Sequence, residues 1–218
     1  MDLAPYIDHT NLKPAATTGE IITLCAEAQE LGFAAVCINP CHAVTAKKAL
    51  QGVHVKLAVV IGFPLGAATT PAKVFEAREA VLNGADELDM VINIGALKEG
   101  CHSLVEGDIR AVVEAAGQAA VKAIIETCYL TDDEIARACG LAVRGGASFV
   151  KTSTGFGPAG AKVEHVRLMR AAVGPEIGVK AAGGIRTYQD AMEMIEAGAN
   201  RIGTSAGMAI IRGAGHSL

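Results

Sequence analysis

The sequence predicts a single α/β domain folded as a (β/α)8 TIM barrel, and two observations favour this fold over an open, doubly wound sheet. Short apolar segments alternate with amphipathic ones along all 218 residues and give eight strand–helix units. Polar residues also collect where the expected strands end, as they do at the catalytic face of such barrels. No linker or low-complexity tract interrupts the pattern, so one domain over 1–218 is expected.

Eight segments are too short for helices, and most of them are rich in valine or isoleucine, so we expect strands there. The first segment, 6–9, is short and weakly marked. The seven stronger candidates are 34–39, 56–62, 87–93, 121–127, 149–154, 178–183 and 201–204.

Helices are expected between these strands because their first turns carry start signals. Thr17 with Glu20, and Thr131 with Glu134, fit the capping box, in which side chains satisfy the free amides of the first turn. Cap residues before a proline mark two more starts, and glycines mark helix ends, where a left-handed residue is needed. These further signals are Asn39-Pro40, Thr70-Pro71, Gly32, Gly84 and Gly198, and helix starts are expected near 17, 40, 71, 102, 131, 162, 187 and 205.

The composition limits the classes of function. Apolar residues make up 51% of the chain but aromatic ones only 4%, so the core must consist of small and branched aliphatic side chains, which suits buried parallel strands. The net charge is −4 and no segment concentrates Lys or Arg, so neither a nucleic-acid surface nor a membrane patch is expected. No secretory signal or bilayer-spanning run is visible, and the six scattered cysteines suggest reduced thiols in a cytoplasmic protein.

Lys151 is the first candidate catalytic residue. It stands in the segment FVKTSTG (149–155), inside a strand that otherwise belongs to the core. An ammonium group there is costly to desolvate unless it is paired or loses its proton. A neutral amine attacks carbonyl carbons and forms a Schiff base. The alternative is a lysine that reaches solvent or makes a structural ion pair.

Lys180 and Asp89 strengthen the catalytic interpretation. Lys180 occupies the equivalent place in the next strand, and adjacent like charges lower the pKa of the more buried one, which would free an amine near neutral pH. Asp89 lies in another apolar strand, where an unpaired carboxylate is expensive. It is expected to pair with a lysine or to relay a proton through water, with a buried acid that accepts loop amides as the alternative. Asp8, in the first strand, raises the same question.

Two glycine-rich strand ends predict a phosphate site. They are AGGIRT (182–187) and RIGTSAG (201–207). In barrels, the loops after the last two strands often bind phosphate through backbone amides near a helix N-terminus, and glycines let the main chain approach the anion. No metal site is expected, because Cys37, Cys41 and His42 of the segment CINPCH have no second group of ligands.

Six segments, in order along almost the whole chain, resemble the signature run of the deoxyribose-phosphate aldolase family. They are IDHTNLKP (7–14), AVCINP (35–40), ELDMVINIGAL (87–97), VKTSTGF (150–156), VKAAGGIRT (179–187) and RIGTS (201–205). The motif KTSTG followed by KAAGGIR is highly specific to this family. The resemblance implies a class I aldolase of deoxyribose catabolism that uses no metal or cofactor. Such an enzyme reversibly cleaves 2-deoxy-D-ribose 5-phosphate to acetaldehyde and D-glyceraldehyde 3-phosphate.

The resemblance also assigns roles by position. Lys151 would form the Schiff base, Lys180 would hold off its proton, and Asp89 would be the proton-relay acid, with Asp8 in support. The phosphate would be held by Gly155, Gly183, Gly184, Gly203 and Ser205. Two departures bear on efficiency and on the proton route: Ala206 stands where many relatives have a second serine, and the ending GAGHSL lacks the C-terminal tyrosine of some members.

Two other functions stay open at this point. One is a Schiff-base aldolase of the same barrel type that takes dihydroxyacetone phosphate, not acetaldehyde, as donor. The other is a barrel that binds a phosphate ligand without turnover. Borohydride trapping with acetaldehyde separates this last case, because only a competent amine forms a reducible imine. The expected partners are a sugar phosphate, an aldehyde and further copies of the chain in a homodimer or higher homo-oligomer.

Overall fold

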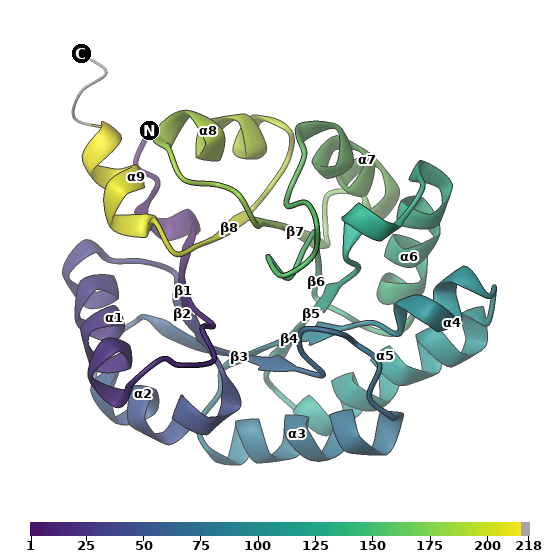
Figure 1. Cartoon of the computed structure of the whole chain (residues 1–218), viewed down its shortest axis with the longest axis horizontal. Helices are drawn as coiled ribbons and strands as arrows, with labels where there is room; N and C mark the ends of the chain where they lie inside the picture. The colour runs from purple at the N-terminus through teal and green to yellow at the C-terminus, as the bar shows by residue number, and fades with distance from the viewer. Residues whose placement is uncertain (215–218) are drawn as a thin grey trace.

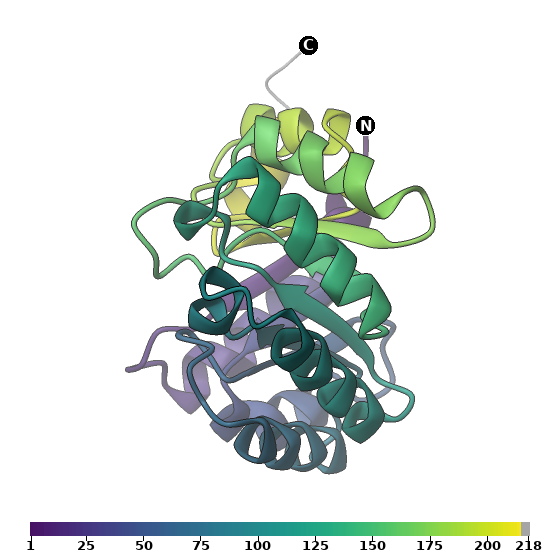
Figure 2. The same cartoon turned by 90° about the vertical axis from the view of Figure 1, so that its right-hand side faces the viewer.

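The computed structural model describes residues 1–214, in which eight parallel strands close into a barrel (Figure 1). The strands pair in chain order, and β1 (Ile7–Asn11) closes the barrel against β8 (Arg201–Thr204). The predicted fold class is therefore confirmed. The chain start lies beside α8 and α9 in both views (Figures 1 and 2), whereas the GAGHSL ending runs beyond the described residues.

All eight expected strands are present, and each except β8 differs from its expected range at one or both ends. β6 (Phe149–Lys151) is shorter than expected, because the Thr152 hydroxyl takes over pairing with β7 by bonding both the N–H and the C=O of Ala182, at 3.0 and 3.1 Å. β1 extends two residues further than expected. The remaining strands are β2 (Ala35–Ile38), β3 (Lys56–Ile61), β4 (Glu87–Val91), β5 (Ala120–Ile124) and β7 (Gly178–Ala182).

The helices surround the barrel (Figure 1). Both expected capping boxes form, and a third joins Thr187 to Asp190. The expected start near 40 is a 3-10 turn, η2 (Pro40–His42), ahead of α2 (Ala43–Ala49), and α4 (Ile94–Lys98) was not expected. The other elements are α1 (Thr18–Leu31), α3 (Thr70–Leu82), α5 (His102–Ala116), α6 (Asp132–Arg144), α7 (Val163–Val173), α8 (Tyr188–Glu196), α9 (Gly207–Ala214), η1 (Ala4–Tyr6) and η3 (Thr127–Tyr129).

The apolar core is divided between two regions. Most of it lies between the strands and the helices, where alternate strand residues such as Leu57, Val59 and Ile61 are fully buried. A second, small cluster of Leu12, Cys37, Ala58 and Val60 packs against Phe63. Charged side chains occupy much of the remaining barrel interior, which is unusual because barrel interiors are mostly filled by branched apolar residues. No helix in the described part of the chain is long and apolar enough to cross a membrane.

Candidate active site

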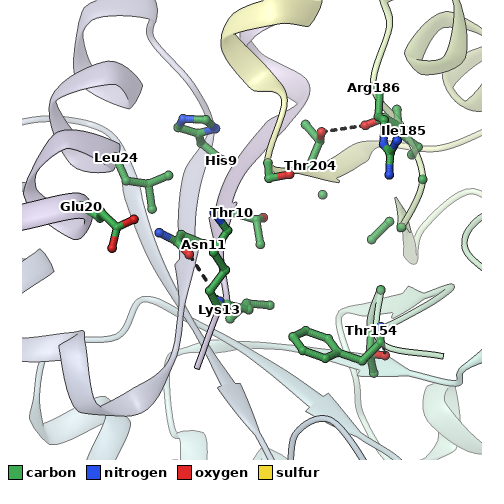
Figure 3. Close-up of a pocket in the computed structure, with 18 of the residues that line it drawn as sticks. His9, Thr10, Asn11, Lys13, Glu20, Leu24, Thr154, Ile185, Arg186 and Thr204 are labelled. Carbon is green, nitrogen blue, oxygen red and sulfur yellow. Dashed lines mark hydrogen bonds between the residues drawn. The ribbon is translucent and has the colours of Figure 1, made fainter. Parts of the chain in front are cut away.

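A cavity of about 780 Å³ opens at the carboxyl ends of the strands. In Figure 3, residues at the end of β1 lie between α1 on one side and the loops after β6, β7 and β8 on the other. The predicted reactive lysine and the predicted phosphate-binding residues all line it. They are Lys151, Gly155, Gly183, Gly184, Gly203 and Ser205.

Lys151 is the lysine of the barrel interior that reaches this cavity. Its side chain is only 3% exposed, and its Nζ donates a hydrogen bond to Asp89 Oδ2 at 2.7 Å. Asp89 itself is fully buried and therefore lies beneath the cavity floor. The structure thus brings together the Lys151 amine and the Asp89 carboxylate, two of the predicted catalytic groups, which lie on separate strands.

Lys180 lies directly beside Lys151 in the register of β6 and β7, as expected, but it is completely buried. Its Nζ donates to Asp8 Oδ2 at 2.5 Å and to Asp89 Oδ2 at 2.7 Å. Burial alone would lower the pKa of Lys180, but the two carboxylates outweigh it and raise the pKa above its ordinary value. Lys180 is therefore an ammonium ion held between two anions.

Three further charged residues belong to this network and were missed by the sequence reasoning. Lys122 Nζ donates to Asp89 Oδ1 at 2.7 Å and contacts Glu87 Oε2 at 2.5 Å. Arg201 binds both oxygens of Glu87, at 3.1 and 3.0 Å, and donates from Nε to Asp8 Oδ1 at 2.6 Å. The signal that could have found them is the one that singled out the reactive lysine, a charged residue inside an apolar strand.

The three carboxyl groups of the network are ionised. Burial alone would raise the pKa of each, but the neighbouring cations outweigh burial. Lys180, Lys122 and Arg201 lower the pKa of Asp8 to about 2, and three lysines hold that of Asp89 well below its ordinary value. These anions therefore persist across the whole neutral range.

The buried network holds four cations and three anions, so it has one positive charge in excess when every group is ionised. The cations are Lys122, Lys151, Lys180 and Arg201, and the anions are Asp8, Glu87 and Asp89. Lys56 also contacts Glu87, at 3.2 Å, but its side chain is 55% exposed and water screens its charge.

Lys151 differs from the other three cations of the network because it alone lines the cavity. It bonds a single carboxylate, which also accepts from Lys122 and Lys180. Nearby carboxylates raise the pKa of Lys122 and of Arg201 despite burial, so those cations keep their protons. Lys151 is therefore the cation of this network that is both open to the cavity and held by one carboxylate alone.

The glycine-rich end of the cavity offers free backbone donors. Gly155, Gly183 and Gly184 have φ values of 87°, 88° and 83°, which side-chain-bearing residues rarely adopt. Gly203 instead leaves room for the Lys180 side chain, because a Cβ there would lie 3.0 Å from Lys180 Cε. Within residues 1–214, four amides at this end have no internal acceptor, those of Gly155, Gly183, Gly184 and Ser205.

Comparisons with known proteins identify the family of the chain. Residues 3–213 match the model of the DeoC/LacD family aldolases. Proteins named deoxyribose-phosphate aldolase from Thermococcus gammatolerans and Streptococcus pneumoniae are 64% and 60% identical, each over 98% of this chain and 97% of their own length. A tetrameric deoxyribose phosphate aldolase from Aeropyrum pernix superposes with a TM-score of 0.93 at 34% identity, over 99% of this chain and 92% of its own. The chain therefore belongs to the DeoC/LacD aldolase family, among its deoxyribose-phosphate aldolases.

Proposed function

We propose that this chain reversibly cleaves 2-deoxy-D-ribose 5-phosphate to acetaldehyde and D-glyceraldehyde 3-phosphate through a Schiff base on Lys151. One observation carries the assignment: Lys151 reaches the cavity and also belongs to a buried network with an excess positive charge. The relatives named deoxyribose-phosphate aldolase, which match almost the whole chain, support the substrate.

The chemistry follows from a neutral amine at the cavity. The Lys151 nitrogen attacks C1 of the open-chain sugar, and loss of water gives a protonated imine. The C3 hydroxyl then loses its proton and the C2–C3 bond breaks, with its electron pair drawn into the imine. This step releases D-glyceraldehyde 3-phosphate and leaves an enamine on Lys151. Protonation of the enamine at C2 and addition of water release acetaldehyde and restore the amine. Asp89, with Asp8 in support, relays protons between the lysines and the substrate through water.

The glycine-rich end of the cavity suits the phosphate group. The free amides of the glycine-rich loops can donate to its oxygens without help from side chains. Lys13 and Arg186 also line the cavity and add positive charge. This end gives the proposed enzyme a reason to prefer the phosphorylated sugar over 2-deoxyribose itself.

Borohydride trapping tests the proposal directly. Reduction with acetaldehyde, followed by peptide mass spectrometry, should place the added mass on Lys151. Absence of any adduct would favour a barrel that only binds phosphate ligands. Faster turnover with dihydroxyacetone phosphate than with acetaldehyde as donor would favour the keto sugar aldolase instead.

Asp89→Asn is expected to separate imine formation from bond cleavage. The change removes one anion and leaves the Lys151 nucleophile in place at the cavity. Trapping with acetaldehyde should therefore survive, whereas C–C cleavage should slow by about a hundredfold or more because the relay acid is lost. Single-turnover kinetics of both steps provide the measurement. Equal slowing of the two would show that Asp89 is structural.

Gly184→Val is expected to weaken binding of the phosphorylated substrate. The residue has a φ of 83°, which valine adopts only with strain, and a Cβ there would point into open space at the cavity. KM for 2-deoxyribose 5-phosphate should rise by about tenfold or more, equal to about 1.4 kcal/mol. Imine trapping by acetaldehyde should be kept. An unchanged preference for the phosphorylated sugar would place the anion elsewhere.

We also propose that the chain assembles into a homo-oligomer. Phe75 and Leu82, seven residues apart on α3, have exposed fractions of 69% and 86%, and large exposed apolar patches often mark association sites. The tetrameric Aeropyrum pernix relative supports this view. Sedimentation velocity checks the proposal, and a purely monomeric species at micromolar concentration would contradict it.

A further inference from the structure

A buried glutamate outside the charged network shapes the loop after β6. Glu126 is 2% exposed, and its Oε1 accepts a hydrogen bond from the Thr154 amide at 3.1 Å while its Oε2 accepts one from the Thr154 hydroxyl. With a φ of 56°, it is the single residue other than glycine in the described chain to adopt positive φ. Such a backbone is unfavourable for a residue with a Cβ and persists where surrounding contacts enforce it.

The Thr154 hydroxyl connects Glu126 to the backbone of the loop after β6. Because its hydroxyl hydrogen is donated to Glu126, the hydroxyl oxygen is available to accept the Phe156 amide, at 3.0 Å. The amides of Thr154 and Phe156 are therefore both used inside the protein. The amide between them belongs to Gly155, which lines the cavity and has no acceptor within residues 1–214. The turn thus reserves one amide for a ligand.

The loop after β8 has the same hydrogen-bonded turn, but its threonine hydroxyl donates to a backbone carbonyl in place of a glutamate. The Thr204 hydroxyl donates to the Ile185 carbonyl at 2.7 Å (Figure 3) and accepts the Ala206 amide at 2.9 Å. The amide left over belongs to Ser205, which also lines the cavity. The loops after β6 and β8, which both line the cavity, therefore present a free amide through the same arrangement.

We propose that Glu126 is a positioning residue for the phosphate end of the cavity and acts through Thr154 on the Gly155 amide. The proposal rests on the proposed function for the identity of the anion as a sugar phosphate. Within the described residues, no hydrogen bond or ion pair joins Glu126 to the buried charged network. Disturbing Glu126 or Thr154 should therefore change anion binding and leave the lysine chemistry in place.

A matched pair of variants at Thr154 tests this proposal. Thr154→Val keeps the volume but removes both hydroxyl bonds, whereas Thr154→Ser keeps the hydroxyl. Valine should raise the inhibition constant of inorganic phosphate and KM for 2-deoxyribose 5-phosphate by about tenfold, equal to about 1.4 kcal/mol, and serine should restore both. Glu126→Gln, which keeps one acceptor oxygen, should fall between them. Glu99→Gln, on an exposed side chain, should leave both constants unchanged.

Measurements on the unphosphorylated sugar and on the imine distinguish this role from a structural one. For Thr154→Val, kcat/KM with 2-deoxyribose and borohydride trapping with acetaldehyde should match the parent protein. Equal losses for both sugars, together with a lowered Tm, would overturn the proposal in favour of general destabilisation. An unchanged inhibition constant for phosphate would also overturn the proposal, because it would show that the Gly155 amide does not bind the anion. Failure of trapping in the parent protein would instead refute the proposed function.

Discussion

Lys151→Ala should abolish both cleavage and imine trapping while the fold persists. The remaining network has three cations and three anions, so its charge is balanced without the lysine. Asp89 also keeps two partners, because Oδ1 still accepts from Lys122 and Oδ2 from Lys180. The loss of kcat should be on the order of 10⁴-fold or more, equal to about 5.4 kcal/mol. The other lysine among the described residues that line the cavity, Lys13, is exposed and is no part of the buried network, so it is not expected to replace Lys151.

Lys151→Arg should be just as inactive and provides the sharper comparison. A guanidinium group keeps the positive charge but stays protonated, so it cannot attack a carbonyl carbon. Turnover assays, mass spectrometry after borohydride reduction and thermal unfolding of both variants give the measurements. Lys48→Ala, which removes an exposed lysine of α2, is the control and should retain full activity. Appreciable turnover by either Lys151 variant would show that the nucleophile lies elsewhere.

Lys180→Leu should lower kcat by about two orders of magnitude or more, equal to about 2.7 kcal/mol. Lys180→Leu removes the one excess positive charge of the network from a position directly beside Lys151, and a nearby like charge disfavours an ammonium ion. The ascending limb of the pH–rate profile should therefore move upward. A profile that stays in place would refute the excess-charge account.

Lys122→Leu is the matched variant for this effect. It removes the same charge from the network, although Lys122 contacts Oδ1 of Asp89 whereas Lys180 contacts Oδ2. If total charge controls the amine, its pH profile should move in the same direction as that of Lys180→Leu. Each variant also leaves a buried carboxylate short of a partner, which costs about 3–5 kcal/mol of stability for a fully broken pair. Calorimetry and the longer, neutral Lys180→Met variant separate this loss from the kinetic effect.

Much of the fold and of the cavity lining could be predicted from the sequence because both depend on local signals. The alternation of short apolar and amphipathic segments predicted the barrel. Lysine or aspartate inside an apolar strand predicted the candidate catalytic residues Lys151, Lys180, Asp89 and Asp8. The pairing of Lys122 with Asp89 depends on the register of separate strands, which no local pattern encodes. The position of Glu126 depends on an unusual φ, and α4 is only five residues long, too short for a periodic signal.

The ion pairs that join β1 to the last two strands tie active-site formation to the final stage of folding. Asp8 is 172 residues from Lys180 and 193 residues from Arg201 in the chain. Contacts between such distant residues form late, because a large loop must close first. A growing chain that has released β1 but not β7 and β8 would bury Asp8 without those two partners, which disfavours early closure of the interior. The amine and its surrounding charges therefore become functional together, when the last strand completes the ring.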